Sequence, residues 1–187
     1  MTAKTVVTRH ASDLLLVAAT EFELAGQDGL VCGVGPVEAA AAVARKLAGI
    51  TPRAVVNVGL AGGRGLAPCT LVVGSEAIYH DLRAGVPVLN RLSPAADALA
   101  LAQSALPEAR TMPIVTSATV GGDNGDPEVE GMEGFAVLRA CALAGVPAVE
   151  VRAISNEVGE EDRLRWDIPG AIRALATAIP RLQAAFG

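Results

Sequence analysis

Short, unbroken runs of apolar residues do most to constrain how this chain can fold. Residues 14–19, 30–34 and 54–60 are three such runs. A run of this kind is typical of a strand buried on both faces, as in a parallel sheet covered by helices. Between the second and third runs, apolar side chains recur at helical intervals after Pro36, and Gly49 follows the last of them. Proline at the start and glycine past the end are helix boundary signals, so the order strand, helix, strand predicts a parallel βαβ unit.

The rest of the chain continues this alternation. Further strands are predicted at 71–79, 113–120 and 148–154, and further helices at 94–105, 132–144 and roughly 169–185. The glycine-rich, acidic stretch 120–134 is predicted to contain a loop, and we find neither an internal repeat nor a linker. The predicted fold is α/β, a three-layer αβα sandwich with a mixed, largely parallel central sheet, in one domain spanning 1–187.

The composition agrees with this fold class and argues against several others. Half of the residues are hydrophobic (51%), yet the chain has only three Phe, one Tyr and one Trp. Ala, Val, Leu and Ile must therefore fill the core. A net charge of −5 argues against a nucleic-acid partner, because proteins that bind phosphate backbones usually carry a clustered excess of Lys and Arg. Cys32, Cys69 and Cys141 are widely spaced and are interpreted as reduced core thiols.

The N-terminal segment carries no predicted membrane or export signal. Lys4, Arg9 and His10 precede the apolar run 14–19, which ends before Glu21 and Glu23. That run is too short for a signal peptide or a membrane span. We therefore expect a cytoplasmic protein with no membrane partner.

Polar residues that follow buried strands are the informative ones, because ligands of α/β sheets bind beyond the carboxyl ends of the strands. Glu23 follows the first strand, the segment 59–65 follows the third, and Ser155 and Asn156 follow the last. Glu133 lies near a helix start after a glycine-rich approach. A solvated or dipole-stabilising acid is an equally good interpretation of Glu23 and of Glu133 from spacing alone.

Two further patterns have a structural and a functional interpretation. The segment 59–65 lacks both the G-x-G-x-x-G order and the Walker Lys-Ser/Thr pair, so we expect a close backbone approach to a ligand or another chain rather than a phosphate loop. Glu150 and Arg152 lie on one side of a buried strand and are predicted to form ion pairs. A role for them in binding an acidic substrate is the alternative.

These segments, in this order, resemble the purine nucleoside phosphorylase and nucleosidase superfamily. Residues 18–24 (AATEFEL), 57–63 (NVGLAGG) and 77–81 (AIYHD) are similar to motifs of methylthioadenosine/S-adenosylhomocysteine nucleosidases, and 130–134 (EGMEG) resembles their ribose motif. The segments 132–136 (MEGFA) and 150–156 (EVRAISN), followed by Val158, Gly159, Asp162, Arg163, Trp166 and Asp167, resemble the futalosine hydrolase branch.

The resemblance implies roles for two acids. Glu133 would accept hydrogen bonds from the ribose hydroxyls, with Met132 packed against the sugar, because a carboxylate offers acceptors only. Glu23 would act as the general base that orients and deprotonates the attacking water. An acidic turn beside an apolar Leu60 disfavours phosphate, so hydrolysis is expected rather than phosphorolysis.

The remaining implied site residues concern the purine and its surroundings. Asn156 stands where the adenine-cleaving enzymes have Asp, and an amide can donate to O6 of hypoxanthine whereas an ionised Asp would repel it. The other substrate-binding residues implied are Leu60, Ala61, Gly62, Ser155 and Phe135. Arg83, Arg91 and His80 are candidates for binding the substrate carboxylate.

By the same resemblance, neither a metal nor an organic cofactor is needed, and the expected partners are a purine nucleoside and further copies of this chain in a dimer or tetramer. Two alternatives stay open. One is a methylthioadenosine/S-adenosylhomocysteine-type nucleosidase, and the other is a non-catalytic nucleoside-binding module.

Overall fold

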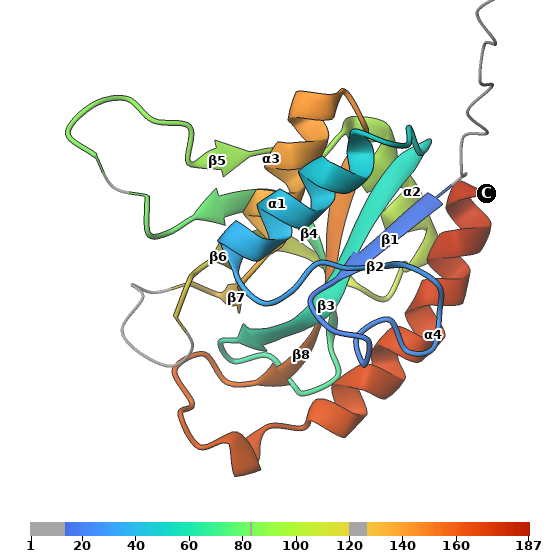
Figure 1. Cartoon of the computed structure of the whole chain (residues 1–187). Helices are drawn as coiled ribbons and strands as arrows, with labels where there is room; N and C mark the ends of the chain where they lie inside the picture. The colour runs from blue at the N-terminus through green and yellow to red at the C-terminus, as the bar shows by residue number, and fades with distance from the viewer. Residues whose placement is uncertain (1–13, 83, 120–126) are drawn as a thin grey trace, which may run out of the picture.

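The computed structural model describes residues 14–82, 84–119 and 127–187, and strands and helices alternate along them (Figure 1). The strands are β1 (Leu14–Ala18), β2 (Leu30–Val31), β3 (Ala54–Gly63), β4 (Leu71–Tyr79), β5 (Arg91–Leu92), β6 (Arg110–Thr116), β7 (Val129–Gly131) and β8 (Ala148–Asn156). The helices are α1 (Pro36–Leu47), α2 (Ala96–Ala105), α3 (Gly134–Ala144) and α4 (Ile168–Phe186), with the short 3-10 helix η1 (Arg163–Arg165). Within these ranges no helix is both long enough and apolar enough to cross a membrane.

The sheet is mixed and largely parallel, as predicted. β1 lies between β2 and β3, and both pairings are parallel, as are β3 with β8, β4 with β6, and β6 with β7. β8 also pairs with β4, and β7 pairs with β3, both antiparallel. These pairings close β3, β8, β4, β6 and β7 into a barrel-like ring. The α/β class is therefore confirmed, but the predicted three-layer sandwich assumes an open sheet and does not describe this closure.

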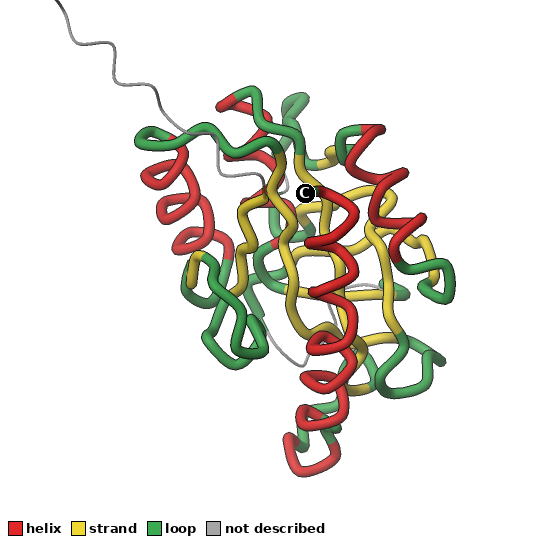
Figure 2. Tube along the Cα trace, turned by 90° about the vertical axis from the view of Figure 1, so that its right-hand side faces the viewer, coloured by secondary structure: helices red, strands yellow, loops and turns green. Residues whose placement is uncertain are grey.

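Helices cover the sheet on two sides. α1 and α3 pack together over Leu15, Val17 and Val55, whereas α2 and α4 pack over Val56, Val58 and neighbouring residues (Figures 1 and 2). Consecutive side chains of a strand point to opposite faces, so the apolar run of β3 supplies both cores. The small aliphatic residues expected from the composition fill them.

The predicted helix boundaries agree closely with the structure. Gly35 precedes α1 with φ of 93°, a left-handed conformation that glycine adopts without steric cost, and Pro36 is the first helical residue. Gly145 ends α3 in the αL conformation. Asp167 caps α4, because its carboxylate accepts a hydrogen bond of 2.9 Å from the Gly170 N–H.

Three local predictions differ from the structure. The strand predicted at 54–60 continues to Gly63, with β8 on one side of it and β7 on the other. The predicted strand 113–120 lies at Arg110–Thr116, in register with β4. Part of the predicted loop 120–134 is β7, while 120–126 lies outside the described residues. Each difference arises from pairing with strands distant in the sequence.

Candidate active site

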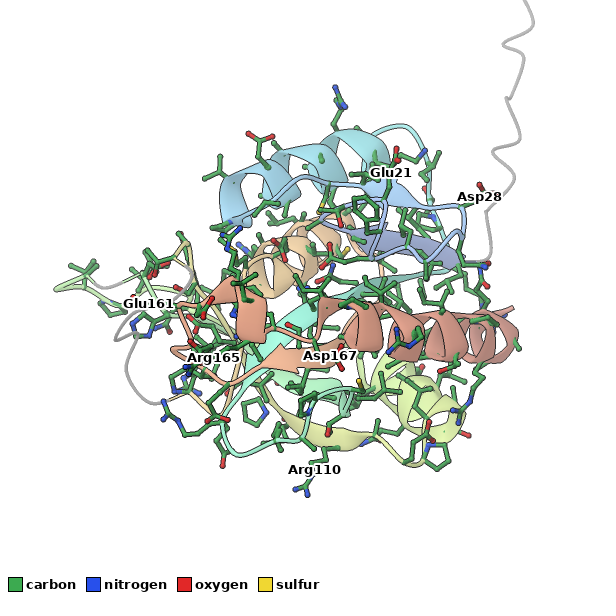
Figure 3. All side chains as sticks on the ribbon, turned by 90° about the horizontal axis from the view of Figure 1, so that it is seen from below. Glu21, Asp28, Arg110, Glu161, Arg165 and Asp167 are labelled. Carbon is green, nitrogen blue, oxygen red and sulfur yellow. The ribbon has the colours of Figure 1, made fainter. Side chains whose placement is uncertain are left out.

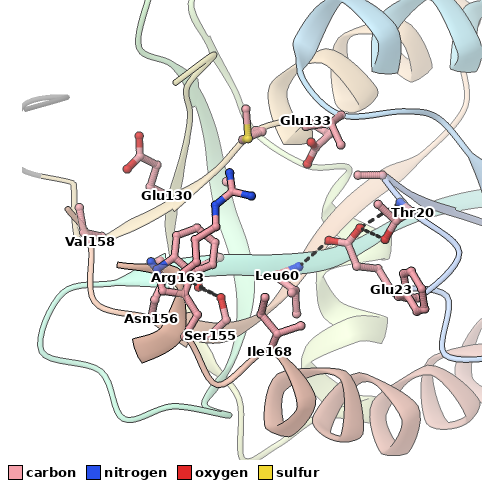
Figure 4. A pocket seen from close by; sticks show the side chains of 18 of the residues that line it. Thr20, Glu23, Leu60, Glu130, Glu133, Ser155, Asn156, Val158, Arg163 and Ile168 are labelled. Carbon is pink, nitrogen blue, oxygen red and sulfur yellow. Dashed lines mark hydrogen bonds between the residues drawn. The ribbon is translucent and has the colours of Figure 1, made fainter. Parts of the chain in front are cut away.

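A cavity of about 450 Å³ lies beyond the carboxyl ends of β1, β3 and β8, a size suited to a small molecule (Figure 4). Seven segments contribute to it: the turn after β1, the loop before α1, the end of β3, the residues after β6, the β7–α3 junction, the end of β8, and the approach to α4 with its first turns. The residues that line it are Ala19, Thr20, Phe22, Glu23, Val34, Leu60, Ala61, Gly62, Thr119, Glu130, Gly131, Met132, Glu133, Ser155, Asn156, Val158, Gly159, Arg163, Trp166, Ile168 and Ile172.

The structure brings almost all of the predicted site residues to this one cavity. Glu23, Leu60, Ala61, Gly62, Met132, Glu133, Ser155 and Asn156 all line it. Because these residues come from four separate parts of the chain, their convergence depends on the parallel arrangement of β1, β3 and β8.

Glu23 is held in place at one end of the cavity by hydrogen-bond donors. Its side chain is buried, and Oε2 accepts hydrogen bonds from the Thr20 N–H (3.0 Å) and the Thr20 hydroxyl (2.9 Å), while Oε1 accepts one from the Leu60 N–H (2.9 Å) (Figure 4). These three groups, two from Thr20 and one from Leu60, are all donors, which suits a carboxylate acceptor. A carboxylate oriented in this way beside a cavity can accept a proton from a bound water.

Glu133 is the residue before α3, but its side chain does not cap that helix. Its Oε1 instead accepts a hydrogen bond of 3.0 Å from the Gly35 N–H, and its Oε2 lies 3.3 Å from Nη1 of Arg152. The interpretation of Glu133 as a first-turn acid that serves only its own helix therefore fails. The helix predicted at 132–144 also starts two residues too early, since α3 begins at Gly134.

Arg152 and Glu150 form the predicted ion pair, with 2.7 Å between Nε and Oε1. Both side chains are buried. Arg152 also contacts Glu133, which lines the cavity. Burial raises the pKa of Glu150 and Glu133 adds to this effect, while the attraction of Arg152 opposes it. Burial works against the charge of Arg152, but the three carboxylates of Glu150, Glu133 and Glu23 raise its pKa.

The amide of Asn156 lies at the opposite end of the cavity from Glu23. Its Oδ1 accepts a hydrogen bond of 2.7 Å from the Ser155 hydroxyl (Figure 4). Its Nδ2 donates one of 2.9 Å to the Glu157 carbonyl. An amide group has two N–H donors and two acceptor positions. One donor and one acceptor position therefore stay available to a ligand.

Phe135 is the predicted site residue that the structure does not bring to the cavity. Its ring is buried and stacks on Tyr79, with 5.5 Å between ring centroids. Its N–H donates a hydrogen bond of 2.8 Å to the Thr116 hydroxyl. As the second residue of α3, Phe135 faces the sheet, so its role is in the core.

A cation and an aromatic ring at the cavity belong to the family motifs but were assigned no role from the sequence. Arg163 and Trp166 line it together, and the Arg163 guanidinium lies 5.7 Å from the Trp166 ring centroid. The three residues predicted as candidates for binding the substrate carboxylate fit this cavity less well. Arg91 pairs with Glu76, and neither Arg91 nor His80 lines the cavity. Arg83 lies outside the described residues. The position of Arg163 and Trp166 in the segment after a buried strand was the sequence signal that could have identified them as site residues.

The three cysteines are free thiols and lie outside the cavity lining. Burial raises the pKa of Cys32 to about 11 and that of Cys141 to about 12. Among the residues that the structure describes, no group of three or more His, Cys, Asp and Glu could hold a metal ion.

Comparison with known proteins identifies the family of this chain. The pattern of the phosphorylase superfamily matches residues 29–185. The futalosine hydrolase of Streptomyces coelicolor is 36% identical over 84% of this chain and 78% of its own length, and that of Acidothermus cellulolyticus is 36% identical over 85% of this chain and 76% of its own length.

A solved structure shows the same fold. Streptococcus pneumoniae MTA/SAH nucleosidase, in complex with 8-aminoadenine, is similar with a TM-score of 0.80 at 21% identity, covering 92% of this chain and 99% of that one. Because the family pattern and the 36% identical relatives each span most of the chain, this protein belongs to the phosphorylase superfamily, as its motifs suggested.

Proposed function

We propose that this protein hydrolyses the N-glycosidic bond of futalosine, releasing hypoxanthine and dehypoxanthine futalosine in menaquinone biosynthesis. The observation that carries the proposal is the convergence of Glu23, Glu133 and Asn156 on one cavity. The two relatives named futalosine hydrolase support the choice of substrate.

Glu133 and Met132 would hold the ribose. Both Glu133 oxygens already have a partner, Gly35 N–H and Arg152 respectively, and each carboxylate oxygen can accept a further hydrogen bond. The carboxylate orientation is therefore set before the sugar hydroxyls arrive, which lowers the entropic cost of positioning the substrate.

Glu23 would orient and deprotonate the attacking water. The bond to the purine would break through an oxocarbenium-like transition state, with negative charge moving into the ring as water approaches the anomeric carbon. Three acids, Glu23, Glu130 and Glu133, line the cavity, so a phosphate dianion would be repelled there. This charge favours water over phosphate as the nucleophile.

Asn156 would recognise the 6-oxopurine through hydrogen bonds. Its remaining N–H can donate to O6, and its carbonyl can accept a hydrogen bond from a protonated N7. The 5′ side of the nucleoside would then extend toward Arg163 and Trp166, where the guanidinium can bind the benzoate carboxylate of futalosine through two parallel hydrogen bonds.

Two alternatives predict different behaviour. A methylthioadenosine/S-adenosylhomocysteine-type nucleosidase would prefer 6-aminopurines, and the amide of Asn156 and the apolar Leu60 argue against it here. A non-catalytic nucleoside-binding module would bind without releasing purine. The fixed orientation of Glu23 by three donors favours catalysis over binding alone.

A homo-oligomer in the cytoplasm is part of the same proposal. Phe22 and Val34 line the cavity yet are 80% and 57% exposed, and Val37 is 76% exposed. Apolar residues exposed at a cavity rim suit coverage by a second copy of the chain. Light scattering after gel filtration tests this, and a strict monomer would contradict it.

The direct test is incubation of the purified protein with futalosine in phosphate-free buffer, followed by chromatographic detection of free hypoxanthine. We expect release without added phosphate and much slower release of adenine from methylthioadenosine. Purine release that requires phosphate would contradict hydrolysis, and the absence of release from every nucleoside would contradict an enzymatic role.

A further inference from the structure

Glu150 is a fully buried acid that lies next to the site without lining it. It is 1% exposed, points from β8 toward the α1 and α3 side, and stands beside Asn57 of β3 in the register of the two strands. Its Oε2 has no hydrogen-bond partner among the residues that the structure describes. A buried polar atom without a partner is costly, so the presence of this acid needs an explanation beyond stability.

The contacts of Arg152 indicate what Glu150 does. Arg152 Nε donates to Glu150 Oε1 at 2.7 Å, and Nη2 donates to Asn57 Oδ1 at 2.9 Å. These two bonds fix the plane of the guanidinium and direct Nη1 toward Glu133 Oε2, 3.3 Å away, and toward the Leu60 carbonyl, 3.5 Å away. The N–H of the same Leu60 binds Glu23. The Arg152 guanidinium therefore contacts Glu133 directly and is linked to Glu23 through Leu60.

Glycines make room for this arrangement. A Cβ at Gly134 would overlap the Glu150 carboxyl group, and a Cβ at Gly59 would overlap Arg152 Nη1. A Cβ at Gly131 would lie 3.3 Å from Arg152 Nε, which is also tight. Glycine thus occupies three positions next to the Glu150–Arg152 ion pair. The close packing there leaves the pair little space to change its orientation.

We propose that Glu150 is a positioning residue, which holds the Arg152 guanidinium in the orientation that presents the Glu133 and Glu23 carboxylates to the cavity. Apolar side chains of similar volume can replace buried ion pairs with little loss of stability, so stability alone does not require an acid here. Glu150 acts through its hydrogen bond to Nε, a contact that an amide can reproduce. The inference rests on the proposed function, because its kinetic test measures nucleoside hydrolysis.

The test compares Glu150→Gln with Glu150→Leu. Gln keeps an acceptor for Arg152 Nε, so we expect kcat within about tenfold of the wild-type protein. Leu has a similar volume but no acceptor, and we expect a loss of at least about 100-fold in kcat, because small displacements of catalytic groups have effects of that size. Val151→Ala is the control: Val151 lies buried on the opposite face of β8, so its loss should lower the unfolding midpoint and leave kcat unchanged.

Two kinetic outcomes would overturn the proposal: a Leu variant within about threefold of wild type, or a Gln variant as slow as the Leu variant. A crystal structure of Glu150→Leu provides a second measurement that needs no substrate. We expect displaced Arg152 and Glu133 side chains, and unchanged positions would also overturn the proposal. If the wild-type protein hydrolyses no nucleoside, the proposed function fails, and the crystal structure alone decides the role of Glu150.

Discussion

Arg152 Nη1 lies 3.3 Å from Glu133 Oε2, so the pocket acid at the start of α3 is paired with a cation that has no exposed surface. The Gly35 N–H holds the other oxygen of Glu133 at 3.0 Å. Glu133 is therefore held between two donors that come from different parts of the chain.

Glu133→Gln places an amide N–H₂ group against one of these two donors. We expect kcat/KM to fall by about 10- to 100-fold, since a hydrogen bond to a charged group contributes about 1.5–3 kcal/mol. The assay is hypoxanthine release from futalosine, with Glu38→Gln on the exposed start of α1 as the control. Activity close to wild type in Glu133→Gln would contradict the ribose-binding role.

Glu23→Gln removes the proposed base while keeping the size of the side chain. We expect kcat to fall by about 10²- to 10⁴-fold, because general base catalysis typically contributes this much. The unfolding midpoint, measured in parallel, separates this effect from misfolding. Turnover near the wild-type rate in a folded variant would show that Glu23 does not activate the water.

Asn156→Asp replaces the amide with a carboxylate, which repels O6 of hypoxanthine and can accept from a 6-amino group. We expect the ratio of kcat/KM for inosine-type over adenosine-type nucleosides to fall by at least about tenfold. Competing hydrolysis of both substrates in one mixture measures the ratio directly. An unchanged ratio would place purine recognition elsewhere in the cavity.

Arg163→Ala removes the cation from the 5′ end of the cavity. We expect kcat/KM to fall by about five- to thirtyfold for futalosine and to stay unchanged for inosine, which lacks the carboxylate. Arg165→Ala is the matched control, since Arg165 belongs to the same segment (Figure 3) and its exposed side chain pairs with Glu160. Equal losses for futalosine and inosine would contradict the carboxylate-binding role.

Gly134→Ala introduces a Cβ where the Glu150 carboxyl group lies. We expect the free energy of unfolding to fall by about 1–3 kcal/mol, as in other overpacked cores, even though alanine normally favours a helix. Gly85→Ala is the control, because a Cβ there meets nothing within 4 Å. Urea unfolding of both variants measures the difference. A Gly134→Ala protein as stable as wild type would show that the ion pair can move aside.

The alternation of strands and helices was predictable because it depends on local periodicity. Proline and glycine at the ends of α1, and Gly145 after α3, marked the helix boundaries by backbone sterics alone. The positions of Glu23 and Asn156 after buried strands made them candidate site residues, but spacing alone left Glu23 and Glu133 equally open to a structural interpretation. The family resemblance assigned their roles.

The closure of the sheet was not predictable in this way. β3 extends to Gly63 only because β7 and β8 pair with its end, and β7 itself is three residues long. Phe135 looked like part of the site because it adjoins Met132 and Glu133 in sequence. The direction in which α3 leaves the site turns its ring toward Tyr79 instead.

The sequence by itself determined the helices α1, α2, α3 and α4, most of the strands and the polar residues that follow them, because these properties depend on near neighbours in the chain. Only the tertiary structure decided that Arg152 joins Glu133, that Arg163 reaches the cavity and that Phe135 does not. Such contacts join residues far apart in the chain, and side-chain direction and strand pairing, rather than local spacing, determine them.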